Sequence, residues 1–368
     1  MCLSVHCRRM GTLMKKSCGL FLLSVALAFA IKVTPASAGD TKWYPFKMND
    51  ASADALKVIE YTPVEKAEKP HKICVLFPHM KDSFWVAVAY GITEQSKALG
   101  VNMNLYEAGG YDNLPKQLSQ FDDCIASGAD AIVIGAISTV GVAKQVLAAK
   151  AKGIPVIAVT NSFISPDLTA GVFVDLKSMA SASANALLAS VKTGETANVV
   201  TFPGPAGSGW AETMNKDFET VVAKNPNVKT LSSKFGDTGV AVQLQLVQDA
   251  LQAYPSINYI WGTAPTAEAA IGALAEAGRS DIKIISTYEN QAMLDALKRG
   301  DITAFTTQYP VIEGRVAIDE AVRILDKKPF IRLVQPIAGV IDKGTMGKMD
   351  MSTVLAPASW SPVYSVKQ

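Results

Sequence analysis

The segment Ile73–Gly91, ICVLFPHMKDSFWVAVAYG, decides the fold of this chain of 368 residues. Residues 73–77 form an apolar run rich in β-branched and aromatic side chains that stops at Pro78, which is typical of a buried parallel strand. Polar and aromatic residues follow, and apolar residues then return at helical spacing. Asp82 or Ser83 is suited to cap that helix. Because α/β sheets bind ligands at the carboxyl ends of their strands, the segment predicts one wall of a ligand-binding cleft.

The alternation of strand and helix continues along the chain. Uniformly apolar strands are expected at 131–135, 155–159, 198–202 and 283–286, and a long amphipathic helix at 312–327. Strands this apolar belong in a parallel sheet that helices cover on both faces. Two copies of a βαβα run predict an α/β fold with two doubly wound parallel-sheet lobes, joined by a multi-strand hinge.

Domain boundaries follow from this alternation and from the composition of the chain ends. We expect a signal peptide at 1–38, an N-terminal arm at 39–70, a first lobe from 72–175 plus 302–330, a second lobe from 176–301 plus 331–345, and a C-terminal tail at 346–368.

The first 38 residues have the features of an export signal. Basic residues precede an apolar run at 20–31, and the small residues Pro35-Ala36-Ser37-Ala38 follow it. The apolar run is too short to span a membrane, so we expect export with cleavage near Ala38.

Removal of this segment changes both the charge and the cysteine content. The remainder has 30 basic and 33 acidic residues, a net charge of −3, which argues against a nucleic-acid partner. Cys74 and Cys124 remain. In an exported protein they can form a disulfide, which would close a loop of about 50 residues and contribute roughly 4 kcal/mol. Two buried thiols are the alternative at this point.

No constellation of residues in the sequence predicts catalysis, a cofactor or a metal site. His71 and His79 lack partners at metal-ligand spacing. The glycine-rich loop 204–209 lacks the Lys-Ser/Thr ending of a phosphate-binding loop. Ser232 and Ser233 are not in the context of a nucleophile elbow. We therefore expect a binding protein and not an enzyme.

The order of motifs resembles the type I periplasmic binding proteins, the ribose-binding class. The resemblance is carried by Asp112 followed by Gln117, by residues 128–133 and by Gly153-Ile154-Pro155-Val156, and it extends over most of 72–345. It implies two lobes, a periplasmic location and a small-molecule ligand in the cleft between the lobes.

A narrower resemblance is to the TorT family, whose members bind trimethylamine N-oxide and signal to the periplasmic domain of a sensor histidine kinase. Residues 78–85, PHMKDSFW, with Tyr90-Gly91, and residues 107–111, EAGGY, carry this resemblance. Cysteines also tend to occur in that family at the positions of Cys74 and Cys124.

Motif matching to this family implies which residues bind the ligand. They are Asp82, Phe84, Trp85, Tyr111 and Tyr288. The family has an aromatic residue after Val174-Asp175, whereas this chain has Leu176. We expect that Trp261, or else Trp210, replaces this missing wall of the site, the alternative for Trp261 being a place in the core.

Each matched residue also has a purely structural interpretation. Asp82 can be only a helix cap, Trp85 a core residue, Tyr111 a turn residue and Tyr288 a strand end. His79 is expected to be a hydrogen-bonded structural residue. Polar side chains at other predicted strand ends are Asn161, Asp175, Asp237 and Gln308.

The set of residue types fits a small methylated ligand better than a sugar. Aromatic faces attract methylammonium groups by about 0.5–2 kcal/mol per ring, and a donor must meet the oxygen of an N-oxide, because an unmet buried polar group costs roughly 1–3 kcal/mol. We expect a two-lobed protein that closes on such a ligand by hinge motion and signals to a sensor histidine kinase. The alternative is the binding protein of an ABC permease for a sugar or other small polar solute.

Overall fold

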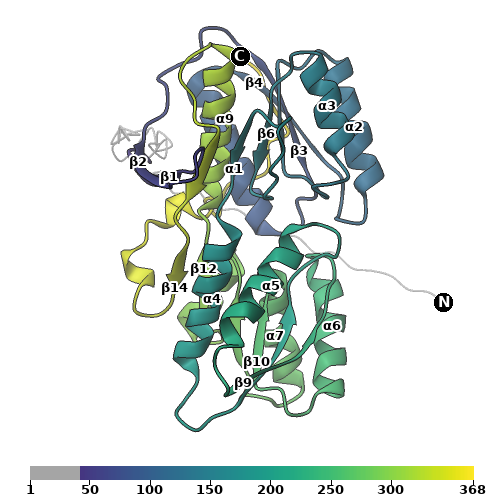
Figure 1. Ribbon diagram of the computed structural model, residues 1–368, viewed down its shortest axis with the longest axis vertical. Coiled ribbons are helices and arrows are strands. Elements are labelled where there is room, and N and C mark those ends of the chain that lie inside the picture. The colour runs from purple at the N-terminus through teal and green to yellow at the C-terminus, as the bar shows by residue number, and fades with distance from the viewer. Residues whose placement is uncertain (1–41) are drawn as a thin grey trace, which may run out of the picture. The chain divides into compact units, whose positions relative to one another are not determined.

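The computed structural model describes residues 42–368 (Figure 1). The predicted signal peptide, 1–38, lies outside the described residues. Within the described range, no helix is both long and apolar enough to cross a membrane. The described chain forms two α/β lobes, each built on its own mostly parallel sheet, which confirms the predicted fold class.

The first lobe contains a nine-stranded sheet in the order β15-β4-β3-β5-β6-β7-β13-β1-β2. The strands from β4 to β13 in this order are parallel, while β15, β1 and β2 add antiparallel edges. Their bounds are β1 Phe46–Asp50, β2 Lys57–Tyr61, β3 Lys72–Phe77, β4 Asn102–Glu107, β5 Ala131–Ile134, β6 Val156–Val159, β7 Ala170–Val172, β13 Leu333–Pro336 and β15 Ser365–Val366.

Helices cover both faces of this sheet. Helices α1 (Ser83–Leu99) and α9 (Pro310–Leu325) pack against each other on one face, and α2 (Leu114–Ala126) and α3 (Ala143–Ala151) lie on the other (Figure 1). The α1–α9 contact is close enough to require glycine, because a Cβ atom at Gly91 would lie 2.1 Å from the Val311 carbonyl oxygen. This packing fixes the first turn of α1, which carries Phe84 and Trp85.

The second lobe contains a six-stranded sheet in the order β14-β12-β11-β10-β8-β9, of which β14 alone is antiparallel to its neighbour. Helices α4 and α5 pack together, as do α6 and α7. The bounds are α4 Leu176–Ser190, β8 Ala197–Phe202, α5 Trp210–Val222, β9 Val228–Ser233, α6 Val240–Ala253, β10 Tyr259–Gly262, α7 Ala264–Glu276, β11 Lys283–Ser286, α8 Gln291–Arg299, β12 Ala304–Thr307 and β14 Gly339–Ile341.

Two parts of the chain belong to a different lobe from the one expected. β12, within the range 302–330 expected in the first lobe, pairs with β11 and β14 of the second-lobe sheet. β13, within the range 331–345 expected in the second lobe, pairs with β7 and β1 of the first. The physical reason is that β12 and β13 each pair within a sheet before the chain passes to the other lobe. The chain passes between the lobes after β7, β12, β13 and β14.

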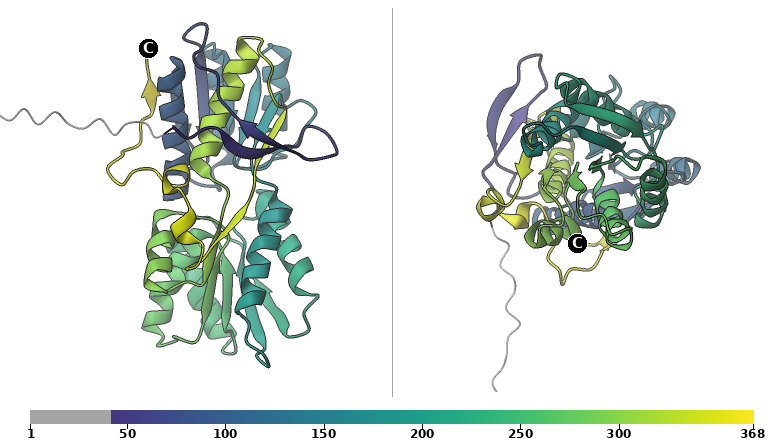
Figure 2. Two further views of the ribbon diagram at one scale, coloured as in Figure 1. Left: turned by 90° about the vertical axis from the view of Figure 1, so that its left-hand side faces the viewer. Right: turned by 90° about the horizontal axis from the view of Figure 1, so that it is seen from below.

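The chain ends also join the first-lobe sheet. β1 and β2, within the expected arm 39–70, form a hairpin at one edge of the sheet (Figure 2). β15, within the expected tail, pairs with β4 at the other edge. Two short 3-10 turns, Met346–Lys348 and Met351–Thr353, precede β15.

A disulfide joins Cys74 of β3 to Cys124 of α2, with 6.0 Å between their Cα atoms. It attaches α2 to the face of the first-lobe sheet where Leu76 and Phe121 are buried.

Candidate functional site

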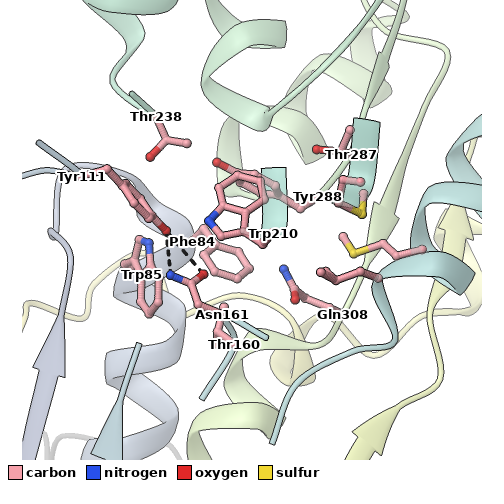
Figure 3. Close-up of a pocket in the computed structure, with 13 residues that line it drawn as sticks. Phe84, Trp85, Tyr111, Thr160, Asn161, Trp210, Thr238, Thr287, Tyr288 and Gln308 are labelled. Atoms are coloured by element: carbon pink, nitrogen blue, oxygen red, sulfur yellow. Dashed lines mark hydrogen bonds between the residues drawn. The ribbon is translucent and has the colours of Figure 1, made fainter. Parts of the chain in front are cut away.

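A cavity lies where strands of both sheets end, between the two lobes (Figure 3). Its volume is about 40 Å³. Each buried water needs roughly 10–15 Å³, so the cavity has room for a compact group of a few non-hydrogen atoms. The residues that line it are Phe84, Trp85, Tyr111, Thr160, Asn161, Leu176, Met179, Trp210, Met214, Thr238, Thr287, Tyr288 and Gln308.

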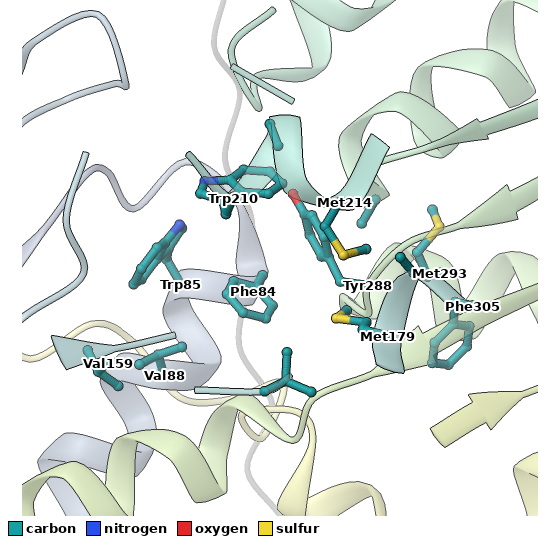
Figure 4. Close-up of a cluster of buried hydrophobic side chains, with 14 of the residues drawn as sticks. Phe84, Trp85, Val88, Val159, Met179, Trp210, Met214, Tyr288, Met293 and Phe305 are labelled. Atoms are coloured by element: carbon teal, nitrogen blue, oxygen red, sulfur yellow. The ribbon is translucent and has the colours of Figure 1, made fainter. Parts of the chain in front are cut away.

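Five of the thirteen lining residues are aromatic, and we call Phe84, Trp85, Tyr111, Trp210 and Tyr288 the cavity cluster. Ring centroids are 5.0 Å apart for Phe84 and Tyr288, 5.7 Å for Phe84 and Trp85, and 6.1 Å for Tyr111 and Trp210. These rings meet at steep or tilted angles, and Phe84, Trp85, Trp210 and Tyr288 stand around the cavity (Figure 4). Three rings come from the first lobe and two from the second.

Glycines make room for both tryptophans of the cluster. A Cβ atom at Gly135, directly after β5, would lie 2.4 Å from the Trp85 ring. A Cβ atom at Gly204, in the loop after β8, would lie 2.4 Å from the Trp210 ring, and Gly204 has a φ of +121°, which few other residues adopt. The glycine-rich loop 204–209 therefore seats an aromatic wall.

Trp261 does not lie at the cavity, contrary to expectation. It is the third residue of β10, fully buried in the second-lobe core, with its ring 4.3 Å from that of Phe218. Its indole N–H donates to Ser183 Oγ at 2.9 Å. A residue inside the strand faces the sheet's helical cover, whereas Trp210 begins α5 beyond the carboxyl end of β8 and so reaches the cavity.

Asp82 lies behind the cavity cluster, not among the residues that line it. Its side chain caps α1 by accepting from the Phe84 N–H at 3.0 Å, as the sequence predicts. It also accepts from the Tyr288 hydroxyl at 2.9 Å and from Asn290 Nδ2 at 3.2 Å, both in the second lobe. Burial raises the pKa of Asp82, and these donors act against the rise. Asp82 thus holds one wall of the cavity across the cleft.

Leu176, the first residue of α4, lines the cavity at the position where the resemblance to the TorT family predicts an aromatic residue. Met179, one turn after Leu176 on α4, and Met214, one turn after Trp210 on α5, also line the cavity (Figure 4). Sequence reasoning missed both methionines. The available signal was helical spacing, because Met179 is three residues after Leu176 and Met214 is four after Trp210, which places each pair on one face.

The Trp210 indole and the Gln308 side-chain amide are polar groups at the cavity that are not satisfied by the described residues. The Trp210 indole N–H is buried near the Tyr111 hydroxyl but makes no well-formed hydrogen bond with any residue of 42–368. The Gln308 side-chain amide points toward the cavity, and only its backbone N–H is hydrogen-bonded (Figure 3). By contrast, Asn161 Nδ2 is satisfied by the Tyr111 hydroxyl at 2.9 Å and the Ala136 carbonyl at 2.8 Å. Trp210 and Gln308 can therefore donate to a ligand oxygen.

The lining residues include no charged side chain. A ligand with a carboxylate would meet no cation there, and a bare ammonium ion would meet no carboxylate. Within residues 42–368, no group of three or more His, Cys, Asp and Glu side chains is placed to hold a metal ion. The site is suited to a small molecule that carries no net charge.

Contacts at the rim of the cleft join the lobes opposite the crossing strands. Lys81 forms an ion pair with Asp237, and the His79 ring contacts Thr238 Oγ1 through Nε2 at 2.8 Å. Burial lowers the pKa of His79 to about 4, so the ring is neutral at pH 7. His79 also packs edge-on against Tyr111, with centroids 5.6 Å apart. It has the structural role that the sequence predicts.

Comparison with known proteins places this geometry in a family. The periplasmic binding protein domain model matches residues 73–329. The periplasmic protein TorT of Escherichia coli (strain K12) is 29% identical over 342 residues, which cover 92% of this chain and 95% of that protein.

Two solved structures are also similar. An ABC transporter solute-binding protein from Bradyrhizobium sp. BTAi1 with bound bis-tris is 43% identical, with a TM-score of 0.74 over 88% of this chain and 99% of that one. The TorS sensor domain–TorT complex in the presence of trimethylamine N-oxide matches at 27% identity and a TM-score of 0.71, over 80% of this chain and 99% of that one. The chain therefore belongs to the periplasmic binding proteins, with the type I fold.

Proposed function

We propose that this protein binds trimethylamine N-oxide, or a similarly small methylated amine oxide, in the cavity between its lobes. It acts in the periplasm after removal of 1–38 and signals to the periplasmic domain of a sensor histidine kinase. Asp82 positions Tyr288, while Phe84, Trp85, Tyr111 and Leu176 contact the ligand directly.

The composition of the cavity wall is the observation that carries this proposal. Five rings and two methionines surround a small uncharged space that has two unsatisfied donors at its edge. Ring faces attract the partly positive methyl groups of an amine oxide, each by about 0.5–2 kcal/mol. The Trp210 indole N–H and the Gln308 amide supply donors for the strongly accepting oxygen. Leu176 and Met179 supply apolar contact where an aromatic wall is missing.

Size and polarity argue against a sugar in this arrangement. A pentose presents several hydroxyls, each of which needs a partner when buried. The carboxylates and guanidinium groups that usually meet sugar hydroxyls are absent from the described lining. A pentose is also bulkier than trimethylamine N-oxide, so the lobes would have to separate further to admit it.

The proposal of a kinase partner is supported by similarity to TorT, which has been crystallised with the TorS sensor domain. A second candidate has specific support as well. The 43% identical structure is described as an ABC transporter solute-binding protein and contains bis-tris, a hydroxylated tertiary amine. In that case the partner is an ABC permease and the same cavity delivers an amine for import.

Calorimetric titration of residues 39–368 in a buffer free of bis-tris tests the ligand. The ligands are trimethylamine N-oxide, trimethylamine, glycine betaine, bis-tris and ribose. We expect saturable binding of the N-oxide, weaker binding of trimethylamine because it lacks the oxygen, and none of glycine betaine because its carboxylate finds no cation. Tight ribose binding without any response to the N-oxide would refute the proposal. Neighbouring genes for a histidine kinase or for a permease and ATPase distinguish the two partners.

A further inference from the structure

Two fully buried glutamates, Glu289 and Glu313, lie behind the cavity and outside its lining. Glu289 follows β11 in the second lobe, and Glu313 is in the first turn of α9 in the first lobe. Burial raises the pKa of both carboxyl groups, that of Glu289 to about 7. Because buried carboxyl groups are costly, their placement calls for a reason beyond packing.

Glu313 joins a cavity residue to the first crossing between the lobes. One carboxyl oxygen accepts from the Thr160 hydroxyl at 2.9 Å, and the other accepts from the Val174 N–H at 3.1 Å. Thr160 lines the cavity, and Val174 lies where the chain leaves β7 for the second lobe. One side chain therefore fixes a wall of the site relative to a crossing strand.

Glu289 makes the corresponding contacts at the second crossing. Its Oε1 accepts from the backbone N–H groups of Gln308 and Tyr309, each at 3.1 Å, and from the Thr307 hydroxyl. Gln308 carries an unpaired amide at the cavity, and Tyr309 caps α9 where the chain returns to the first lobe. The carboxyl group therefore fixes the residue that offers a donor to the ligand.

Backbone strain coincides with both contacts. Among residues 42–368, three non-glycine residues have a positive φ, and Thr160 (63°) and Tyr309 (59°) are two of them. Strained backbone persists where surrounding contacts hold it, and it concentrates at ligand sites and switches. Each of these two residues is held by one of the two buried glutamates.

We propose that Glu289 and Glu313 are positioning residues for the ligand. Each glutamate is hydrogen-bonded both to a polar residue of the cavity and to the segment where the chain crosses between the lobes. The two carboxyl groups therefore fix the cavity wall and the crossing segments in one arrangement. The inference rests on the proposed function for its ligand, but the contacts themselves can be tested without one.

The test compares Glu313→Ala and Glu313→Gln with Glu320→Gln. Glu320 is a matched control, because it is a fully buried glutamate on the same helix whose partners, the Tyr61 hydroxyl and the Ile331 N–H, lie away from the cavity. In calorimetry with trimethylamine N-oxide we expect Glu313→Ala to raise Kd about 10-fold, the usual scale for a lost buried hydrogen bond. Glu313→Gln should recover most of that loss, since an amide can accept from Val174 and donate to Thr160. Glu320→Gln should change Kd by less than about 2-fold even if it lowers stability.

Amide hydrogen exchange of the ligand-free variants separates this inference from the proposed function. Glu313→Ala should accelerate exchange at Val174, which loses its acceptor, and leave Leu105 in the distant strand β4 unchanged. If Glu313→Ala does not fold, Glu289→Ala is examined in the same way at Gln308 and Tyr309. Wild-type protein that gives no heat with the N-oxide would refute the ligand, and the exchange result would still decide the role of the glutamates. Unchanged exchange at these amides, or an equal loss of affinity in Glu320→Gln, would overturn the inference.

Discussion

The cavity cluster and the core of the second lobe are built from the same kinds of residue but are packed in opposite ways. In the core, Trp261 stacks on Phe218 at 4.3 Å with an interplanar angle of 27°, and its N–H is satisfied by Ser183. In the cavity cluster, Trp210 meets Tyr111 at 6.1 Å and 62°, and its N–H makes no well-formed hydrogen bond with a described residue. Both tryptophans are buried, so burial alone does not separate the two regions.

The difference shows what marks a ligand site made of aromatic residues. Packing that serves stability brings ring faces together and pairs every buried donor. At the cavity, by contrast, a space remains between the rings and a buried donor beside it is not satisfied by the described residues. The comparison predicts that changes in the core act on stability and that changes in the cavity cluster act on affinity.

The largest effects are expected from truncating the two tryptophans. Trp261→Ala removes a fully buried ring and should lower the free energy of unfolding by about 3–5 kcal/mol, with Kd for trimethylamine N-oxide nearly unchanged. Trp210→Ala should raise that Kd roughly 30-fold, about 2 kcal/mol, because it removes both a ring face and a donor. Urea unfolding and calorimetry on both variants measure the two quantities. A loss of affinity in Trp261→Ala as large as that in Trp210→Ala would break the comparison.

The positions of these residues also show how far the sequence can predict the site. Phe84, Trp85, Tyr111 and Tyr288 were assigned through the motifs shared with the TorT family, and their places after predicted strand ends agree with that assignment, because parallel sheets bring such residues together. The sequence predicts that Trp261, as a strand-end residue, lies at the site. β10 extends to Gly262, so Trp261 lies inside the strand, where its side chain faces the core. A shift of one residue in a strand changes the face on which a side chain lies.

The rest of the site depends on tertiary contacts as well as on periodicity. Helical spacing places Met179 and Met214 on the faces of Leu176 and Trp210, but that these faces meet depends on how α4 and α5 pack together. The roles of Glu289 and Glu313 depend on where the crossings lie. The two-lobed fold was predictable from the apolar strands alone. Which sheet β12 and β13 join was not predictable. Both strands are short, and each is compatible with either sheet until its neighbouring strands are known.

An intermediate effect is expected from His79, a buried group that packs against the cavity cluster and has an unpaired Nδ1. The pKa of His79 is about 4 in the folded protein and 6.5 in the unfolded chain. Between these two pH values the unfolded chain holds a proton on this ring that the folded protein does not. Stability from His79 is therefore present above pH 6.5 and is lost as pH falls toward 4. Between pH 7 and pH 5 the wild type should lose about 2 kcal/mol relative to His79→Gln.

Urea unfolding of both proteins at pH 7 and pH 5 measures this change. The difference between the two proteins is the relevant quantity, because the raised pKa values of buried carboxyl groups such as Glu289 give both proteins an opposite trend. A stability difference that stays constant between the two pH values would contradict the neutral, buried state of His79.

The smallest effect separates two tyrosine hydroxyls, one from each region. Tyr288→Phe keeps the ring at the cavity but removes the 2.9 Å hydrogen bond to Asp82 of the other lobe, and we expect Kd to rise roughly 10-fold, about 1.4 kcal/mol. Tyr259→Phe removes, inside the second lobe, a 3.1 Å hydrogen bond to the Ser190 carbonyl and the 2.8 Å hydrogen bond that the hydroxyl accepts from Lys283 Nζ. It should lower the free energy of unfolding by about 1 kcal/mol and leave Kd unchanged. Because both substitutions delete one hydroxyl from a buried ring, their contrast isolates the link across the cleft. Equal effects of the two substitutions on Kd would mean that the hydroxyl of Tyr288 serves the stability of its own lobe and not the closure of the site.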